Sequence, residues 1–124
     1  MAIQSFRELK VWQRAHELAL HIYKVTNGFP PEEKFGLISQ MRRAAISVAA
    51  NIVEGFRRAG ARDSLRFYDI ANASLEELRY ETIVSHDLGY LSENERKITE
   101  QKLEETSKML NGWIRSQKRN PPKN

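Results

Sequence analysis

The chain has 124 residues, of which 40% are hydrophobic and 29% charged, a composition typical of one globular domain with a modest core. It contains no cysteine, which excludes a disulfide framework, a thiolate metal site and a cysteine nucleophile. Twenty lysines and arginines against sixteen acidic residues give a net charge of +4, which permits contact with phosphate groups without predicting it.

Turn signals divide the chain into four segments with helical periodicity, and the first two are predicted helices over residues 6–26 and 31–56. The first carries an apolar stripe at Val11, Ala15, Leu18, Ile22 and Val25. The second begins with a proline, which suits a first helical turn, and we expect it to end near Gly55. Its stripe is Ile38, Met41, Ala45, Val48 and Ile52.

The third and fourth predicted helices span residues 62–88 and 93–117. Asp63 or Ser64 is expected to cap the third helix and Gly89 to end it. Its stripe is Tyr68, Ala71, Leu75 and Leu78. A capping-box pattern from Ser92 to Glu95 opens the fourth helix. The stripe of the fourth is Leu103, Thr106, Leu110 and Trp113.

Four long helices joined by short loops favour an all-α fold, an antiparallel up-down-up-down four-helix bundle. We expect one domain over residues 1–119 and a flexible tail over residues 120–124. No apolar run approaches the roughly 20 residues that cross a bilayer, and the N-terminus lacks the order of a signal peptide. We therefore expect a soluble, cytoplasmic protein without membrane contact.

Several polar side chains on the second and third helices are expected to have structural roles. The register of an antiparallel hairpin places Arg42 and Arg43 level with Glu77, which predicts an Arg–Glu pair between these helices. Asn51 and Glu54 are three residues apart and share a helix face. They either form part of a binding surface or satisfy groups in the following loop, including the two arginines just after Gly55.

The sequence gives little indication of a catalytic site. His16, Glu17 and His21 resemble a zinc-protease helix, but that motif needs histidines four residues apart, and these are five apart. The serines of the predicted helices have no histidine at a helical neighbour position, and the adjacent glutamates, Glu76-Glu77 and Glu104-Glu105, point about 100° apart, so neither pair shares a site by itself. We therefore expect a non-enzymatic protein with no catalytic residues, no metal site and no cofactor.

The basic residues give the strongest functional signal. In an up-down bundle, the loop between the second and third helices and the end of the fourth helix lie at the same end. This arrangement gathers Arg57, Arg58, Arg62, Arg66, Arg115, Lys118 and Arg119. Phe56 and Phe67 lie nearby in the sequence, and aromatic rings among arginines are suited to stack bases. The cluster is either a solvated rim that keeps the protein soluble or a contact surface for RNA or DNA.

An ordered set of motifs covers the chain up to about Trp113. The set is Phe6-x-x-Leu9-x-Val11-Trp12, Phe29-Pro30-x-Glu32, Gln40-Met-Arg-Arg-Ala-Ala45, Ser47-x-x-x-Asn51-Ile-x-Glu54-Gly55, Ile70-Ala71-x-x-Ser74-x-x-Glu77-Leu78 and Leu88-Gly-Tyr-Leu91. It resembles the four-helix-bundle family of ribosomal-RNA intervening-sequence proteins. Many relatives have a proline where this chain has Ala49 or Ala50, so we expect its second helix to be less kinked.

The resemblance implies an antiparallel bundle that assembles into a homopentameric ring and carries no catalytic residues. A related branch, the accessory protein of diversity-generating retroelements, binds nucleic acid and a reverse transcriptase, so both are possible partners. Trp12, Tyr23, Phe35, Phe56 and Tyr80 exceed what one small core holds, which agrees with an interface. Five copies of a +4 chain would carry about +20. The alternative function is a scaffold that docks a protein on an apolar helix face.

Overall fold

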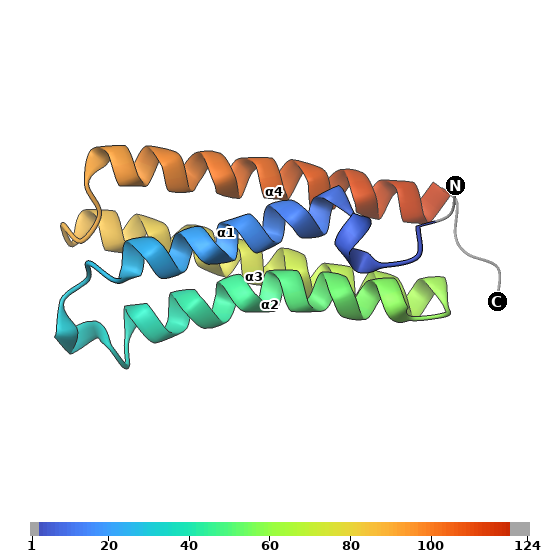
Figure 1. Cartoon of the computed structure of the whole chain (residues 1–124), viewed down its shortest axis with the longest axis horizontal. Coiled ribbons are helices and arrows are strands. Elements are labelled where there is room, and N and C mark those ends of the chain that lie inside the picture. The colour runs from blue at the N-terminus through green and yellow to red at the C-terminus, as the bar shows by residue number, and fades with distance from the viewer. Residues whose placement is uncertain (1–2, 120–124) are drawn as a thin grey trace.

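Four long helices lie along one common axis and make up most of residues 3–119, the part of the chain that the computed structural model describes (Figure 1). The elements in chain order are η1 (Phe6–Glu8), α1 (Lys10–Thr26), η2 (Pro31–Glu33), α2 (Leu37–Arg57), α3 (Ala61–Asp87) and α4 (Glu93–Arg119). Both α1 and α3 pack against α2 and α4. Consecutive helices run in opposite directions, which confirms the predicted all-α bundle (Figure 1). The predicted tail, residues 120–124, lies outside the described residues.

The first two predicted helices begin later than the sequence indicated. Residues 6–8 form a separate 3-10 turn, in which the Ser5 hydroxyl accepts a hydrogen bond from the Arg7 backbone N–H, and Leu9 is extended. Pro31 begins a second 3-10 turn rather than α2 itself. The Glu33 carboxylate then accepts a hydrogen bond of 3.1 Å from the backbone N–H of Leu37 at the start of α2. The proline therefore marks the start of a short 3-10 turn that leads into α2.

Gly55 does not end α2, because the helix continues to Arg57. The glycine is buried, and a Cβ atom at this position would overlap Cε1, Cδ1 and Cζ of Tyr68 on α3. Its role is therefore to let the Tyr68 ring approach the α2 backbone. The preference of glycine for helix ends misled the prediction, because close packing places the same residue inside a helix.

The predicted cap of α3 is also wrong. Gly60 holds the N-cap position, and no side chain forms a cap hydrogen bond there. Ser64 instead donates to the carbonyl of Arg58, at 3.4 Å. Asp63 lies in the first helical turn, where a carboxylate favours the positive end of the helix dipole.

The connection between α3 and α4 follows its sequence signals closely. Gly89 has a φ of 83°, in the left-handed region that favours glycine. Its N–H donates to the carbonyl of His86, and the N–H of Tyr90 donates to that of Ser85, which closes α3 with a Schellman motif. Ser92 and Glu95 form the predicted capping box, at 3.1 and 2.8 Å.

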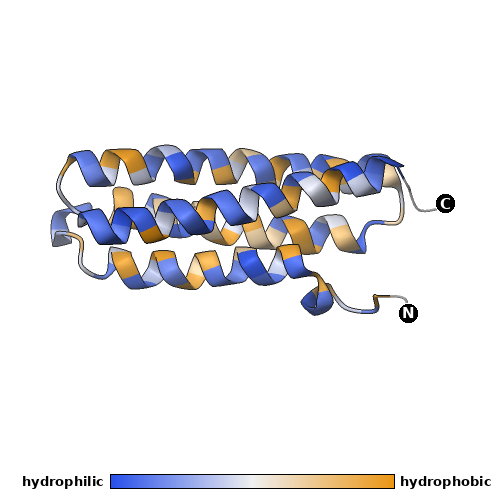
Figure 2. Ribbon diagram, turned by 90° about the horizontal axis from the view of Figure 1, so that it is seen from above, coloured by the Kyte–Doolittle hydropathy of each residue, from blue (hydrophilic) through white to orange (hydrophobic). Residues whose placement is uncertain are grey.

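Hydrophobic and hydrophilic residues alternate along every helix (Figure 2). The predicted stripes supply most of the core, since every stripe residue except Ile38 and Trp113 is buried and those two are partly buried. Four buried threonines interrupt the apolar surface, and each hydroxyl donates to the carbonyl four residues earlier. They are Thr26, Thr82, Thr99 and Thr106. These four hydroxyl groups are thus satisfied within their own helices, which avoids the free-energy cost of leaving them unpaired.

Candidate functional site

The predicted basic residues gather at one end of the bundle. The ends of α2 and α4 and the start of α3 lie together there (Figure 1). This basic pole consists of Arg57, Arg58, Arg62, Arg66, Arg115, Lys118 and Arg119. Most of these side chains are exposed, including those of Arg57 and Arg66, which are about two-thirds exposed at 66% and 67%. The up-down order of the helices therefore brings these residues to the same end of the bundle, as expected from the sequence.

Two acidic residues reduce the charge of the basic pole. Glu54 lies 3.0 Å from Arg58 and 3.7 Å from Arg57. Asp63 lies 3.1 Å from Arg66 and 3.7 Å from Arg58. Seven cations against these two carboxylates leave a net charge of +5. The contacts of Glu54 agree with the local, structural interpretation of that residue.

The two phenylalanines are not open for base stacking in the way the sequence suggested. Phe56 is partly buried and packs against the core. The guanidinium groups of Arg58 and Arg66 lie over the Phe67 ring, at 4.6 and 5.1 Å from its centroid. These cation–π contacts hold two arginines in place at the turn. The basic pole therefore presents guanidinium groups to solvent, with the Phe67 ring beneath two of them.

Arg42 does not form the predicted pair with a glutamate of α3. Its guanidinium turns to α1 and donates to the Thr26 hydroxyl at 2.9 Å, the Asn27 side-chain oxygen at 3.2 Å and the Tyr23 carbonyl at 3.3 Å. It also lies over the Tyr23 ring, 4.5 Å from the centroid. Arg42 thus caps the C-terminal end of α1, where a cation favours the helix dipole.

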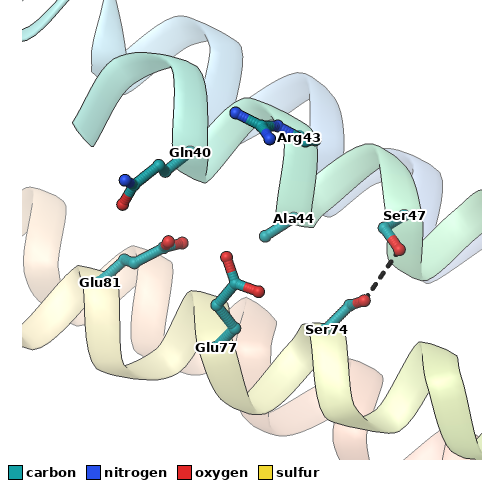
Figure 3. Close-up of a pocket in the computed structure, with 7 residues that line it drawn as sticks. All are labelled: Gln40, Arg43, Ala44, Ser47, Ser74, Glu77 and Glu81. Carbon is teal, nitrogen blue, oxygen red and sulfur yellow. Dashed lines mark hydrogen bonds between the residues drawn. The ribbon is translucent and has the colours of Figure 1, made fainter. Parts of the chain in front are cut away.

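Arg43 lines a polar groove of about 510 Å³ between α2 and α3 (Figure 3). The α2–α3 groove is lined by Gln40, Arg43, Ala44, Ser47, Ser74, Glu77 and Glu81. Arg43 donates to Ser39 at 3.5 Å, and it makes no ion pair with Glu77 or any other residue within 3–119. Arg43 and Glu77 therefore face one groove, but the predicted direct pair is absent.

A hydrogen-bond chain closes one end of the α2–α3 groove. The hydroxyls of Ser47 and Ser74 lie 2.8 Å apart and join the two helices (Figure 3). The Asn51 amide donates to the carbonyl and the hydroxyl of Ser47, at 2.8 and 3.0 Å. The role of Asn51 is therefore to hold the polar contact between α2 and α3.

Glu81 is the most unusual side chain of the α2–α3 groove. It is only 5% exposed, and its Oε1 atom has no hydrogen-bond partner within the described part of the chain. Burial raises the pKa of Glu81 to about 8. The neighbouring Glu77 carboxylate adds to this rise in pKa, and the positive charge of Arg43 opposes it. Glu81 therefore holds a proton at neutral pH.

Glu81 was not among the residues predicted to be functional, although the sequence contains a signal for it. The apolar stripe of α3 ends at Leu78, and Glu81 follows three residues later on the same helix face. A carboxylate in continuation of a buried stripe predicts either a buried acid or a polar site. Nothing in the chain itself marked Gln40 or Ser74 as its neighbours, because these depend on how α2 and α3 pack.

The three residues of the rejected zinc motif do not form a common site. The His16 ring stacks on Trp12 at 5.0 Å between centroids. The His21 ring lies 2.8 Å from the Thr99 hydroxyl, and it thereby links α1 to α4. Partial burial lowers the pKa of His21, and the nearby Lys102 and Lys24 add to this effect. Residues 3–119 hold no group of three histidine or acidic side chains placed to bind a metal ion.

The fold and these sites define an all-α bundle with one basic end and a polar seam between two helices. Residues 7–112 match the family of 23S rRNA-intervening sequence proteins, and the chain belongs to this family. Its fold is similar to that of a protein of unknown function from the S23 ribosomal protein family of Bacteroides thetaiotaomicron VPI-5482. That similarity has a TM-score of 0.75 and 22% identity, and it covers 84% of this chain and 97% of the other. No curated protein matches.

Among the described residues, no helix is both long and apolar enough to cross a membrane.

Proposed function

We propose that this protein is a non-enzymatic, oligomeric helical bundle that binds RNA or DNA through the basic pole. The observation that carries the proposal is the meeting of cations from the ends of α2 and α4 and the start of α3 (Figure 1). Phosphate backbones bind to such clusters through Coulomb attraction and counterion release, with little dependence on base sequence. Exposed guanidinium groups add bidentate contacts to phosphate oxygens.

Assembly would strengthen this proposed contact. The described surface has large apolar side chains in solvent, among them Phe35 at 89% exposed, Tyr80 at 65% and Leu20 at 58%. Contact between copies would cover part of this surface and bring several basic poles together. The sequence resemblance implies a ring of five subunits. In such a ring the positive electrostatic potential at the basic poles would be well above that of one subunit.

A salt titration tests the proposal. The probes are a fluorescent single-stranded RNA and a DNA duplex of unrelated sequences, and the readout is anisotropy at several salt concentrations. Affinity is expected to fall steeply as salt rises. The double variant Arg57→Glu/Arg62→Glu is expected to weaken binding at least tenfold for every sequence and to reduce the salt slope by about two. Arg58 is left intact because it packs on Phe67 and contacts two carboxylates.

The matched control reverses two exposed lysines at the opposite end of the bundle, Lys24→Glu/Lys34→Glu. It changes the net charge by the same amount without touching the basic pole. If the control variant weakens binding as much as the test variant, the effect is one of overall charge and the named surface is wrong. Affinity that does not respond to salt would also contradict a contact with phosphate.

The exposed apolar side chains support a second candidate function, a scaffold that docks a protein partner such as a reverse transcriptase. This alternative predicts a stable monomer that keeps Phe35 and Tyr80 in solvent until the partner binds. A solution mass above that of one chain, together with protection of these side chains, would disfavour it.

A further inference from the structure

The α2–α3 groove lies between the first half of α2 and the second half of α3, away from the basic pole, and takes no part in the contact proposed there. Two carboxylates of α3, Glu77 and Glu81, point toward α2 across it (Figure 3). They are four residues apart, so they lie on the same helix face. Ala44 lines the opposite wall, where its short side chain leaves room between the helices. The groove is thus open between two polar walls.

Glu81 makes this arrangement more than a patch of surface charge. The side chain is 95% buried, given its exposure of 5%, and Oε1 has no hydrogen-bond partner within residues 3–119. A buried polar atom without a partner costs about 1–3 kcal/mol, so native structures usually satisfy such atoms. Gln40 and Arg43 lie on the opposite wall, and Arg43 donates to Ser39. The described residues therefore offer no donor to Oε1 of Glu81, the most deeply placed carboxyl group of the groove.

We propose that the α2–α3 groove binds a guanidinium group, which donates N–H groups to the carboxylates of Glu77 and Glu81. The planar guanidinium presents five donors in a fixed fork and suits two neighbouring carboxylates. The side-chain oxygen of Gln40 supplies a further acceptor on the opposite wall. A metal ion fits less well, because only two carboxylates line the groove and hard cations take six or more oxygen ligands.

The charges of the groove agree with a monovalent cation. With both carboxylates ionised, Glu77, Glu81 and Arg43 sum to one negative charge, which a single guanidinium neutralises. Arg43 on α2 and Glu77 on α3 are the charged groups that face Glu81. Since the pKa of Glu81 is raised to about 8, binding at neutral pH releases the Glu81 proton to the buffer as the cation takes its place.

Proton release makes the proposed affinity depend on pH. Only the carboxylate form of Glu81 accepts the cation, so a pKa of about 8 makes the affinity rise roughly 25-fold from pH 6.5 to pH 8.5. The probe is methylguanidinium chloride, titrated into the ¹⁵N-labelled full chain and followed by amide chemical shifts. Shifts are expected at the amides of residues 74–81 and 40–47, on the two walls. Tetramethylammonium chloride, which has no N–H donor, is expected to cause none of them.

Two variants separate the site from general charge effects. Glu81→Gln keeps the shape of the side chain and is expected to weaken binding at least fivefold and to abolish its pH dependence. Glu76→Gln removes a carboxylate from the exposed side of α3 and is expected to leave the affinity unchanged. Equal binding by wild type and Glu81→Gln, or shifts spread over the exposed acidic residues, would overturn the proposal.

The guanidinium has two conceivable sources, a free small molecule or an arginine side chain of a second copy of this chain. Light scattering at pH 8.5 with and without methylguanidinium distinguishes them. A free ligand binds without changing the mass, whereas an arginine of another copy is displaced, so the mass falls and Glu81→Gln lowers it as well. Absence of both binding and a mass change at every pH rejects the site. None of these outcomes depends on whether the basic pole binds nucleic acid.

Discussion

Arg42 and Arg43 are adjacent in the sequence and contact different helices. Neighbouring helix residues point about 100° apart, so Arg42 reaches the end of α1 while Arg43 faces α3. The sequence placed both at the correct height along the bundle, but it could not tell which side each would face. That choice depends on the rotation of α2, which is set by the buried side of its apolar stripe.

Replacing Arg42 tests its role as a cap for α1. Arg42→Ala is expected to lower the free energy of unfolding by about 1.5–3 kcal/mol, because it removes hydrogen bonds from a charged donor to Thr26 and to the helix end. Arg43→Ala is the matched control and is expected to change stability by about 0.5 kcal/mol or less. Urea denaturation measures both. Similar losses in the two variants would contradict the capping role.

Glu81 gives the stability of the fold a specific pH dependence. Its pKa rises from 4.5 to about 8 on folding, so the folded chain keeps a proton that the unfolded chain has lost. The stability from this group is complete below pH 4.5 and is lost as the pH rises through about 8. Relative to wild type, Glu81→Gln is therefore expected to gain stability over this range, on the order of 5 kcal/mol, because each unit of pKa difference between the folded and unfolded chain is worth about 1.4 kcal/mol.

Thermal denaturation of wild type and Glu81→Gln between pH 5 and pH 9 measures this difference. Glu76→Gln controls for the loss of one carboxylate from α3, on its exposed side. The prediction fails if the gap between wild type and Glu81→Gln stays constant with pH.

At the scale of the elements, α2 and α3 show how far the sequence signals reach. The stripe periodicity identified the buried faces of both helices, because burial and spacing are directly linked. Gly55 misled the prediction of the α2 end, since the physical reason for that glycine lies on another helix, in the ring of Tyr68. A pattern within one segment does not contain information about which side chain of another segment packs against it.

Substitution of two glycines tests the close approach of α2 and α3. Gly55→Ala places a methyl group against the buried Tyr68 ring and is expected to lower the free energy of unfolding by about 1–3 kcal/mol. Gly112→Ala in α4 is the control, since its Cβ would meet only the end of the Arg115 side chain at 3.8 Å. It is expected to raise stability by about 0.5–1 kcal/mol, because alanine favours a helix. Chemical denaturation that ranks the two variants equally would contradict the packing role.

At the scale of the whole molecule, the bundle and the position of the basic pole could be predicted from sequence. Short loops force neighbouring helices to be antiparallel, so the ends that carry Arg57 and Arg119 must lie together. The α2–α3 groove could not be predicted in the same way. It depends on the distance between two helices, which the volumes of Ala44 and of the residues opposite it determine.

Assembly is the prediction that belongs to this scale. Phe35, Tyr80 and Leu20 are large apolar side chains in solvent, and contact between copies would cover part of this surface. Light scattering is expected to give a mass well above 14.4 kDa, and about 72 kDa for a ring of five. A dilution series serves as the control, because a specific assembly keeps a defined mass until it dissociates. A constant mass of 14.4 kDa at high concentration would contradict assembly.

The order of the helices also has a consequence for how the chain reaches this structure. Three of the four packing contacts between helices join helices that are consecutive in the sequence, across the connections 27–36, 58–60 and 88–92. Only the contact of α1 with α4 joins helices that are far apart in the sequence. Topologies dominated by such local contacts have low contact order and fold on the microsecond to millisecond scale. The two central helices are expected to pair early as a hairpin, and docking of the outer helices on each other completes the native state. A newly synthesised chain would then expose its apolar faces only briefly, which limits aggregation before copies meet.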